Sequence, residues 1–64
     1  MPRKIRELIR DLERASFINR GGRGDHRNFE HVKGMRVTLS GKLGDDAKPY
    51  QGREVRKQIQ ESQQ

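Results

Sequence analysis

The stretch Arg20–His26 (RGGRGDH) combines residue types that could hold and cut a phosphodiester. Arginine offers planar N–H donors that match a phosphate, and glycine lets the backbone approach a ligand closely or adopt a positive φ. His26 ends the stretch with a side chain that gives and takes protons near neutral pH. We therefore predict a phosphodiester site here, with His26 as the candidate for proton transfer.

Ribonuclease chemistry would fit this residue set. RNA carries its own nucleophile, the 2′-hydroxyl, so an enzyme needs a base to remove that proton and donors to stabilise the charge on phosphorus. His26 is the natural base, and the route requires no metal ion or other cofactor. The general acid is not identified by the residues, and a phosphate contact without catalysis remains an alternative for His26. The basic residues near it in sequence are Arg20, Arg23, Arg27 and Lys33.

The elements that must position this stretch follow from the spacing of apolar residues. An amphipathic helix is expected over residues 3–15, with Pro2 suited to its start. It is followed by a short strand that begins at Phe17 and ends at a Gly21-Gly22 turn, and by strands over 26–32 and 35–39. A loop over 40–51 then leads to a helix over 52–60. The sequence predicts one α+β domain over residues 1–64. We expect a three-stranded antiparallel sheet with both helices on one face.

Side-chain alternation decides which face of the sheet carries the histidine. If Phe29 points into the core, Arg27 and His31 share its face. His26, Asn28 and Glu30 then point to the face that the helices leave uncovered, unless a slip or bulge reverses the assignment.

The neighbouring strand extends the same assignment. Met35, Val37 and Leu39 are expected in the core, with Arg36 and Thr38 beside His26 on the uncovered face. His31 lies about 17 Å from His26 in a regular strand, and we expect it to be partly buried or at an edge. The uncovered face is the predicted RNA surface. Its expected RNA-binding residues are Arg20, Arg23, Gly24, Asp25, Arg27, Asn28, Lys33 and Arg36.

Composition points to a polyanion as the partner. The chain of 64 residues has 15 Lys and Arg against 9 Asp and Glu, a net charge of +6, while 28% of its residues are hydrophobic. A solvated basic surface without a ligand is the alternative. No apolar run approaches the roughly 18 residues of a membrane span, and the lack of cysteine fits a cytoplasmic protein. Because so short a chain has marginal stability, we expect help from a partner subunit or self-association.

Two further features allow two interpretations each. Arg6, Arg10 and Arg14 form a stripe on the first helix that is either solvated or turned toward phosphate. Tyr50 could stack on a base, but we favour a place in the core beneath the second helix.

The order of these elements resembles the HicA family of bacterial toxins, also called YcfA-like mRNA interferases. The similarity covers essentially the whole chain, and the order and spacing of its parts are more specific than any one of them. Those parts are the helix pattern Ile5, Leu8, Ile9 and Leu12, then Phe17, Arg20, Gly24-Asp25-His26, Phe29, Lys33-Gly34, Arg36–Leu39 and a short closing helix.

The resemblance implies a fold like that of double-stranded-RNA-binding domains, and a toxin of a type II toxin–antitoxin system. It implies a metal-independent endoribonuclease that cleaves mRNA with His26 as the catalytic residue, and a HicB-type antitoxin that covers the His26 face. The family commonly has serine or threonine where this chain has Asp25, and often histidine or a small polar residue where it has Arg27. Asp25 could orient the imidazole or repel phosphate.

Two other classes of function remain possible from the residues. A non-catalytic RNA-binding module of the same fold would use the same basic sheet. A partner-binding protein without an RNA function would use the open face or edge of the sheet for another chain.

Overall fold

The computed structural model describes residues 3–64 and has the predicted order of one helix, three strands and one helix. The elements are α1 (Ile5–Arg14), β1 (Ile18–Gly21), β2 (Arg27–Glu30), β3 (Arg36–Leu39) and α2 (Pro49–Ser62). The strands form an antiparallel sheet in the order β1-β2-β3. The predicted α+β class and strand order are therefore confirmed.

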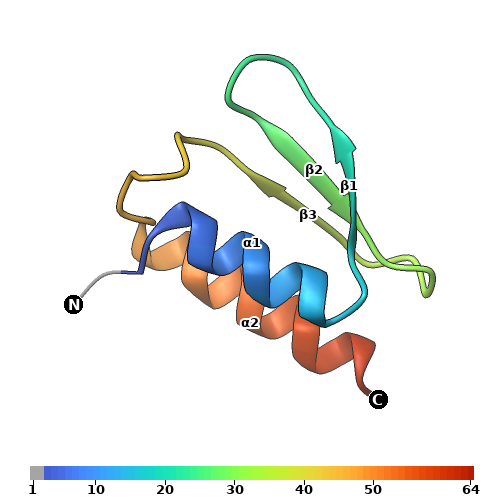
Figure 1. Cartoon of the computed structure of the whole chain (residues 1–64). Coiled ribbons are helices and arrows are strands. Elements are labelled where there is room, and N and C mark those ends of the chain that lie inside the picture. The colour runs from blue at the N-terminus through green and yellow to red at the C-terminus, as the bar shows by residue number, and fades with distance from the viewer. Residues whose placement is uncertain (1–2) are drawn as a thin grey trace.

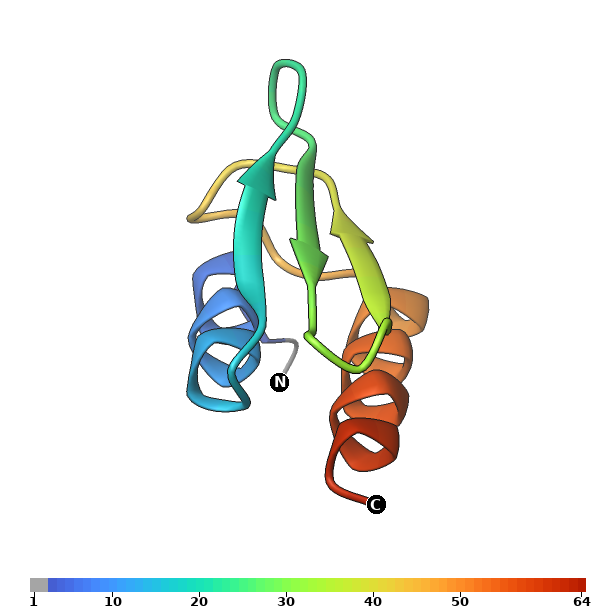
Figure 2. The same ribbon diagram turned by 90° about the vertical axis from the view of Figure 1, so that its right-hand side faces the viewer.

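Both helices lie on the same face of the sheet, as expected. Figure 1 shows the two helices side by side beneath the strands, and in Figure 2 α1 lies behind β1 while α2 lies behind β3. The opposite face of the sheet has no element over it within the described residues. The open face is thus available for a ligand or a partner.

The helix α1 forms because its apolar residues recur on one face. Ile5, Leu8 and Leu12 are buried, and Ile9 packs against the same core. Its first turn is closed by Glu7, whose carboxylate accepts a hydrogen bond from the backbone N–H of Lys4 at 2.7 Å, an N-terminal group that has no partner within the helix. Pro2, which we expected near the start of this helix, lies outside the described residues.

The core lies between the helices and the covered face of the sheet. Phe29 of β2 is its largest fully buried side chain. Val37 and Leu39 are buried and Met35 is partly buried, while Arg36 and Thr38 are exposed, so the predicted alternation of β3 is confirmed. The buried apolar residues come from both helices, from β2 and β3, and from the connecting segments: Ile5, Leu8, Leu12, Phe17, Phe29, Val37, Leu39, Ala47 and Val55.

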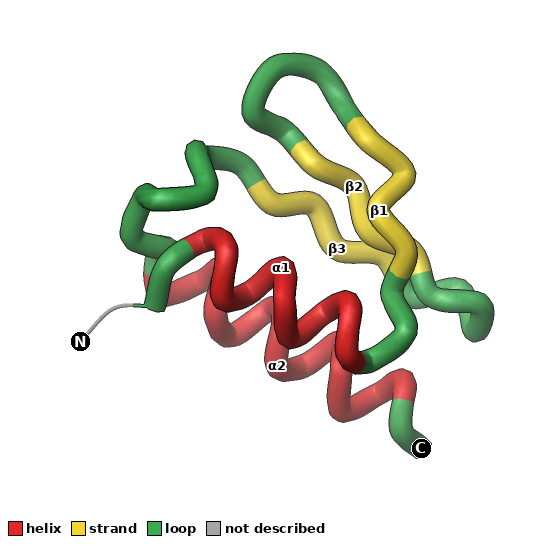
Figure 3. Tube along the Cα trace, viewed as in Figure 1, coloured by secondary structure: helices red, strands yellow, loops and turns green. Residues whose placement is uncertain are grey.

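The second helix was predicted too short. It begins at Pro49 rather than at residue 52 and continues to Ser62. Gln51 secures the early start, because its side-chain oxygen accepts from the Lys48 backbone N–H at 2.8 Å while its nitrogen donates to the Ser40 carbonyl at 3.1 Å. The predicted loop over 40–51 is correspondingly shorter, as the loop segments in Figure 3 show.

The earlier start also explains why our preferred place for Tyr50 was wrong. Gln51, Val55 and Ile59 are spaced by four residues, and this is the face that α2 turns inward. Tyr50 is one position away, about 100° around the helix, and remains 55% exposed. Among residues 3–64, neither helix is long and apolar enough to cross a membrane.

Candidate functional site

The loop between β1 and β2 holds His26 at one end of the sheet. The backbone N–H of His26 donates to the Arg23 carbonyl at 2.9 Å, which closes a tight turn over Arg23–His26. Gly24 has a φ of 58° in this turn, a conformation that costs glycine little and other residues more. The tight turn is therefore at Arg23–His26 rather than at the predicted Gly21-Gly22. The strand begins after His26 rather than at it.

The backbone at Gly22 and the backbone at His26 approach each other closely where this loop begins and ends. A Cβ on Gly22 would clash with the carbonyl group of His26, so only glycine lets the two sides come together as they do. Arg27 supports the same region from the other side, with its guanidinium donating to the Asp25 carbonyl at 3.3 Å and to the Gly41 carbonyl at 2.9 Å. The backbone beside His26 is thus held by contacts on both flanks.

The imidazole of His26 is open to solvent, with 60% of the side chain exposed. Its nearest charged partner is Asp25, whose Oδ1 lies 3.8 Å from Nε2. At this distance Asp25 forms an ion pair with the protonated imidazole and no hydrogen bond with the neutral one. A ligand can reach His26 without any movement of the chain.

The other histidine occupies the opposite environment. His31 is only 8% exposed, and its ring lies 5.1 Å from the Phe17 ring at an angle of 57°. Its Nδ1 accepts a hydrogen bond from the Lys33 backbone N–H at 3.1 Å. The expectation that His31 is a buried or edge residue away from His26 is confirmed.

A row of polar groups crosses the open face of the sheet next to the loop. Asn28 faces Gly21 on β1 and Thr38 on β3 in the strand register. Its amide nitrogen donates to the Gly21 carbonyl at 3.0 Å, and its amide oxygen accepts from the Thr38 hydroxyl at 2.8 Å. Asn28 is exposed, as the alternation predicted.

Farther along the open face, one carboxylate bridges two arginines. Glu30 Oε1 lies 3.4 Å from Arg20 Nε, and Glu30 Oε2 accepts from Arg36 Nε at 3.0 Å. All three are on different strands, so the bridge spans the sheet. Residues of this face line a shallow hollow that includes Arg20, Asn28, Glu30, Arg36 and Thr38.

Glu30 is the site feature that sequence reasoning missed. Alternation had placed Glu30 and Arg36 on one face, and opposite charges at paired positions of neighbouring strands attract each other; that signal was present. The ion pair between Arg20 and Glu30 could not be predicted from the sequence. The β1–β2 register shifts between Asn19 and Gly21, which leaves Arg20 as the extra residue of a β-bulge, and a bulge redirects the side chain that it carries.

The predicted site residues therefore form two groups, with one residue outside both. Arg23, Gly24, Asp25, His26 and Arg27 lie in or beside the loop, while Arg20, Asn28 and Arg36 lie on the open face. Lys33 belongs to neither group.

Lys33 lies in the turn at the other end of β2, and a regular strand puts that end roughly 13 Å from His26. Its ammonium donates to the Ser62 carbonyl at 3.0 Å and the Gln64 carbonyl at 2.8 Å, where a cation complements the C-terminus of a helix.

Comparison with known proteins identifies one family. The family model described as "HicA toxin of bacterial toxin-antitoxin" matches residues 5–60, from the start of α1 to the last turn of α2. The match includes the β1–β2 loop and all three strands. No curated protein matches the sequence.

Proposed function

This chain belongs to the HicA toxin family of bacterial toxin–antitoxin systems, and we propose that it acts there as an endoribonuclease that cleaves mRNA. The observation that carries the proposal is the placement of His26. Its imidazole is exposed at the end of a loop whose backbone is held by hydrogen bonds, with arginines before and after it. A base in this position can be reached by a phosphodiester of the RNA backbone.

The proposed reaction uses the ribose as nucleophile. His26 accepts the proton of the 2′-hydroxyl, the 2′-oxygen attacks phosphorus, and the bond from phosphorus to the 5′-oxygen breaks. The products are a 2′,3′-cyclic phosphate and a 5′-hydroxyl, which takes its proton from water at this open site. Asp25 would pair with the imidazolium formed in the first step, since 3.8 Å separates the two side chains.

Arginine is the proposed stabiliser of the charge that develops on phosphorus. Arg23 is exposed in the loop itself, and the guanidinium of Arg27 keeps further N–H donors free after its two backbone contacts. Gly24 presents backbone next to His26 without a side chain to obstruct a ligand. This route needs no metal ion.

The open face of the sheet is the proposed path of the RNA strand beyond the scissile bond. Arg20 and Arg36 would contact phosphates, and Asn28 would offer its exposed amide. Glu30 holds both arginines in place and would release them when a phosphate takes over as the anion. A HicB-type antitoxin that covers the same face would block the substrate, and an mRNA substrate puts the activity in the cytoplasm.

The test is a comparison of wild type with His26→Ala. We expect the variant to lose RNA cleavage by roughly 10²- to 10⁴-fold, the usual contribution of a positioned general base, and to lose growth arrest when expressed in bacteria. Circular dichroism and RNA affinity should stay near wild type, because the exposed imidazole packs against nothing in the core.

Two outcomes would contradict parts of this proposal. Cleavage by purified His26→Ala at the wild-type rate would remove His26 from the chemistry. RNA binding by the wild-type protein without any cleavage would instead favour a non-catalytic RNA-binding module, a function that the absence of a second histidine beside His26 also fits.

A further inference from the structure

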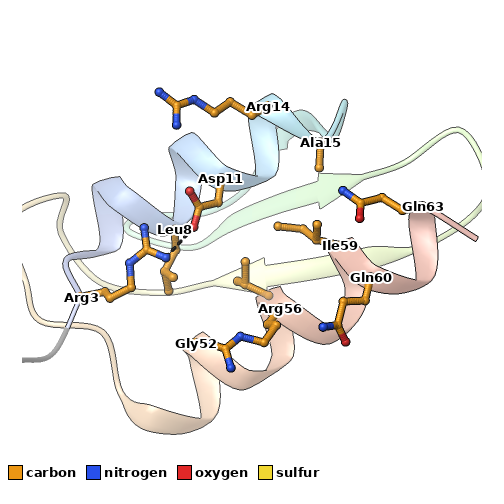
Figure 4. Close-up of a pocket in the computed structure, with 11 residues that line it drawn as sticks. Arg3, Leu8, Asp11, Arg14, Ala15, Gly52, Arg56, Ile59, Gln60 and Gln63 are labelled. Atoms are coloured by element: carbon orange, nitrogen blue, oxygen red, sulfur yellow. Dashed lines mark hydrogen bonds and ion pairs between the residues drawn. The ribbon is translucent and has the colours of Figure 1, made fainter.

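A groove runs between the two helices, away from His26. Its lining comes from α1, α2 and the residues flanking them, and no strand or β1–β2 loop residue takes part. Figure 4 shows side chains of both helices turned toward this groove. Leu8, Ala15, Val55 and Ile59 give it an apolar floor, and Ala15 and Ile59 are only partly buried. Apolar surface is therefore open to solvent in a concave site.

Gly52 lines the same groove and has no role in the fold that would require glycine. It lies within α2, its φ is not positive, and a Cβ added to it would meet no atom within 4 Å. Glycine inside a helix costs about 0.5–1 kcal/mol relative to alanine. A residue that weakens its own helix without a packing reason is expected where function needs the space.

The rim of the groove is basic. Arg14 and Arg56 stand at its sides, and neither forms an ion pair within residues 3–64. Arg3 forms an ion pair with Asp11 at 2.6 Å, and the hydrogen bond and negative charge of Asp11 raise the pKa of that guanidinium. An occupant of this groove must bring apolar side chains for the floor and carboxylates for the rim.

We propose that the groove between α1 and α2 binds an acidic amphipathic helix of a partner protein, with Gly52 leaving room for its close approach. A second copy of this chain fits poorly, because its net charge of +6 would face another basic rim. RNA fits poorly as well, since the apolar floor offers nothing to phosphate or base edges. The proposal does not depend on His26 or on cleavage.

The probe is a synthetic peptide of roughly three helical turns, with leucine on one face and glutamate on the other. Titration into the isotope-labelled 64-residue chain should shift the backbone amide signals of Ala15, Gly52 and Ile59 and leave those of Gly24 and His26 in place. A peptide with lysine in place of glutamate should bind at least about tenfold more weakly, the loss expected from like charges on the rim.

Substitutions at Gly52 separate a binding role from a structural one. Gly52→Ala should raise Tm by about 2–8 °C and yet lower the affinity for the peptide. Gly52→Leu, which fills the groove, should lower that affinity about tenfold or more. Gln58→Leu is the matched control, because it adds the same side chain to α2 outside the groove without a change in charge.

The proposal is overturned if the acidic peptide shifts no groove signals, or if Gly52→Leu binds it as well as wild type. It is also overturned if the groove signals move with an RNA oligonucleotide, or with protein concentration alone, rather than with the peptide. A response to the RNA oligonucleotide would indicate an RNA surface, and a response to protein concentration would indicate a self-association surface.

Discussion

The two histidines of this chain lie five positions apart and meet opposite conditions. His26 sits in a loop, exposed, with one carboxylate nearby, whereas His31 is buried against Phe17 and accepts a backbone hydrogen bond. Strand β2 joins them and puts them at opposite ends of the sheet. The side-chain chemistry is the same, so the surroundings alone make one a candidate for catalysis and the other a packing residue.

The two ends of β2 differ in the same way as their histidines. The His26 end is shaped by backbone contacts around glycines, which leave side chains free for a ligand. The His31 end is occupied by contacts that hold the fold together, from the Phe17 ring to the Lys33 bonds at the end of α2. The histidine at the first end is therefore free to meet a ligand, whereas the histidine and the lysine at the second end are engaged by the fold.

The largest effect on stability is expected for His31→Ala. Removal of the buried ring should lower the free energy of unfolding by about 2–3 kcal/mol through the cavity and the lost contacts, a large share of the stability of so small a domain. Thermal denaturation followed by circular dichroism measures this loss. The cleavage rate per folded molecule, measured at low temperature, should stay near wild type.

His26→Ala supplies the reverse pattern, with cleavage lost and Tm unchanged. If His31→Ala abolished cleavage while the protein remained folded, the separation of the two histidines into different roles would be wrong.

A smaller effect is expected for Gly22→Ala. The added Cβ clashes with the His26 carbonyl group, so the loop must open and move the imidazole. We expect cleavage to fall about tenfold, which corresponds to about 1.4 kcal/mol, while the core signals in an NMR spectrum stay in place. Gly44→Ala is the control, because a Cβ there meets nothing within 4 Å and the residue has no positive φ. Equal cleavage rates for the two variants would show that the close approach of Gly22 to the His26 backbone does not position the imidazole.

The smallest effects are expected when the cation beyond each end of β2 is replaced. Lys33→Met should lower the free energy of unfolding by about 0.3–1 kcal/mol, because the C-terminus of α2 loses its cation, with no change in the salt dependence of RNA binding. Arg23→Met should leave stability unchanged and reduce the slope of log K against log salt by about 1. A reduced slope for Lys33→Met would place RNA at both ends of the sheet.

Periodicity was sufficient to predict which face is buried in elements that have one apolar and one polar face. The spacing of Ile5, Leu8 and Leu12 predicted the buried face of α1, and the alternation of Val37 and Leu39 predicted that of β3. Alternation also separated His31 from the open face. These predictions needed only the period of a helix or a strand, which local sequence contains.

The start of α2 could not be predicted in this way. Pro49 and Gly52 are both typical of loops, so the segment before residue 52 looked irregular. The helix starts at Pro49 because Gln51 bonds to Lys48 and to Ser40, and Ser40 reaches it only once β3 is packed. The error in Tyr50 follows from the same cause, because residue 50 is part of the helix and lies one position, or about 100°, away from the face that Gln51 and Val55 turn inward.

The sequence by itself determined the order of elements, the faces of α1 and β3, the basic character of the surface and His26 as the candidate base. Only the tertiary structure decided that His26 precedes the strand in a turn closed on Arg23, that Arg20 meets Glu30 through a bulge, and that Lys33 serves α2. Local patterns record which way a side chain points from its own element. They do not record what another element brings to meet it, because that depends on register and packing between residues far apart in the chain.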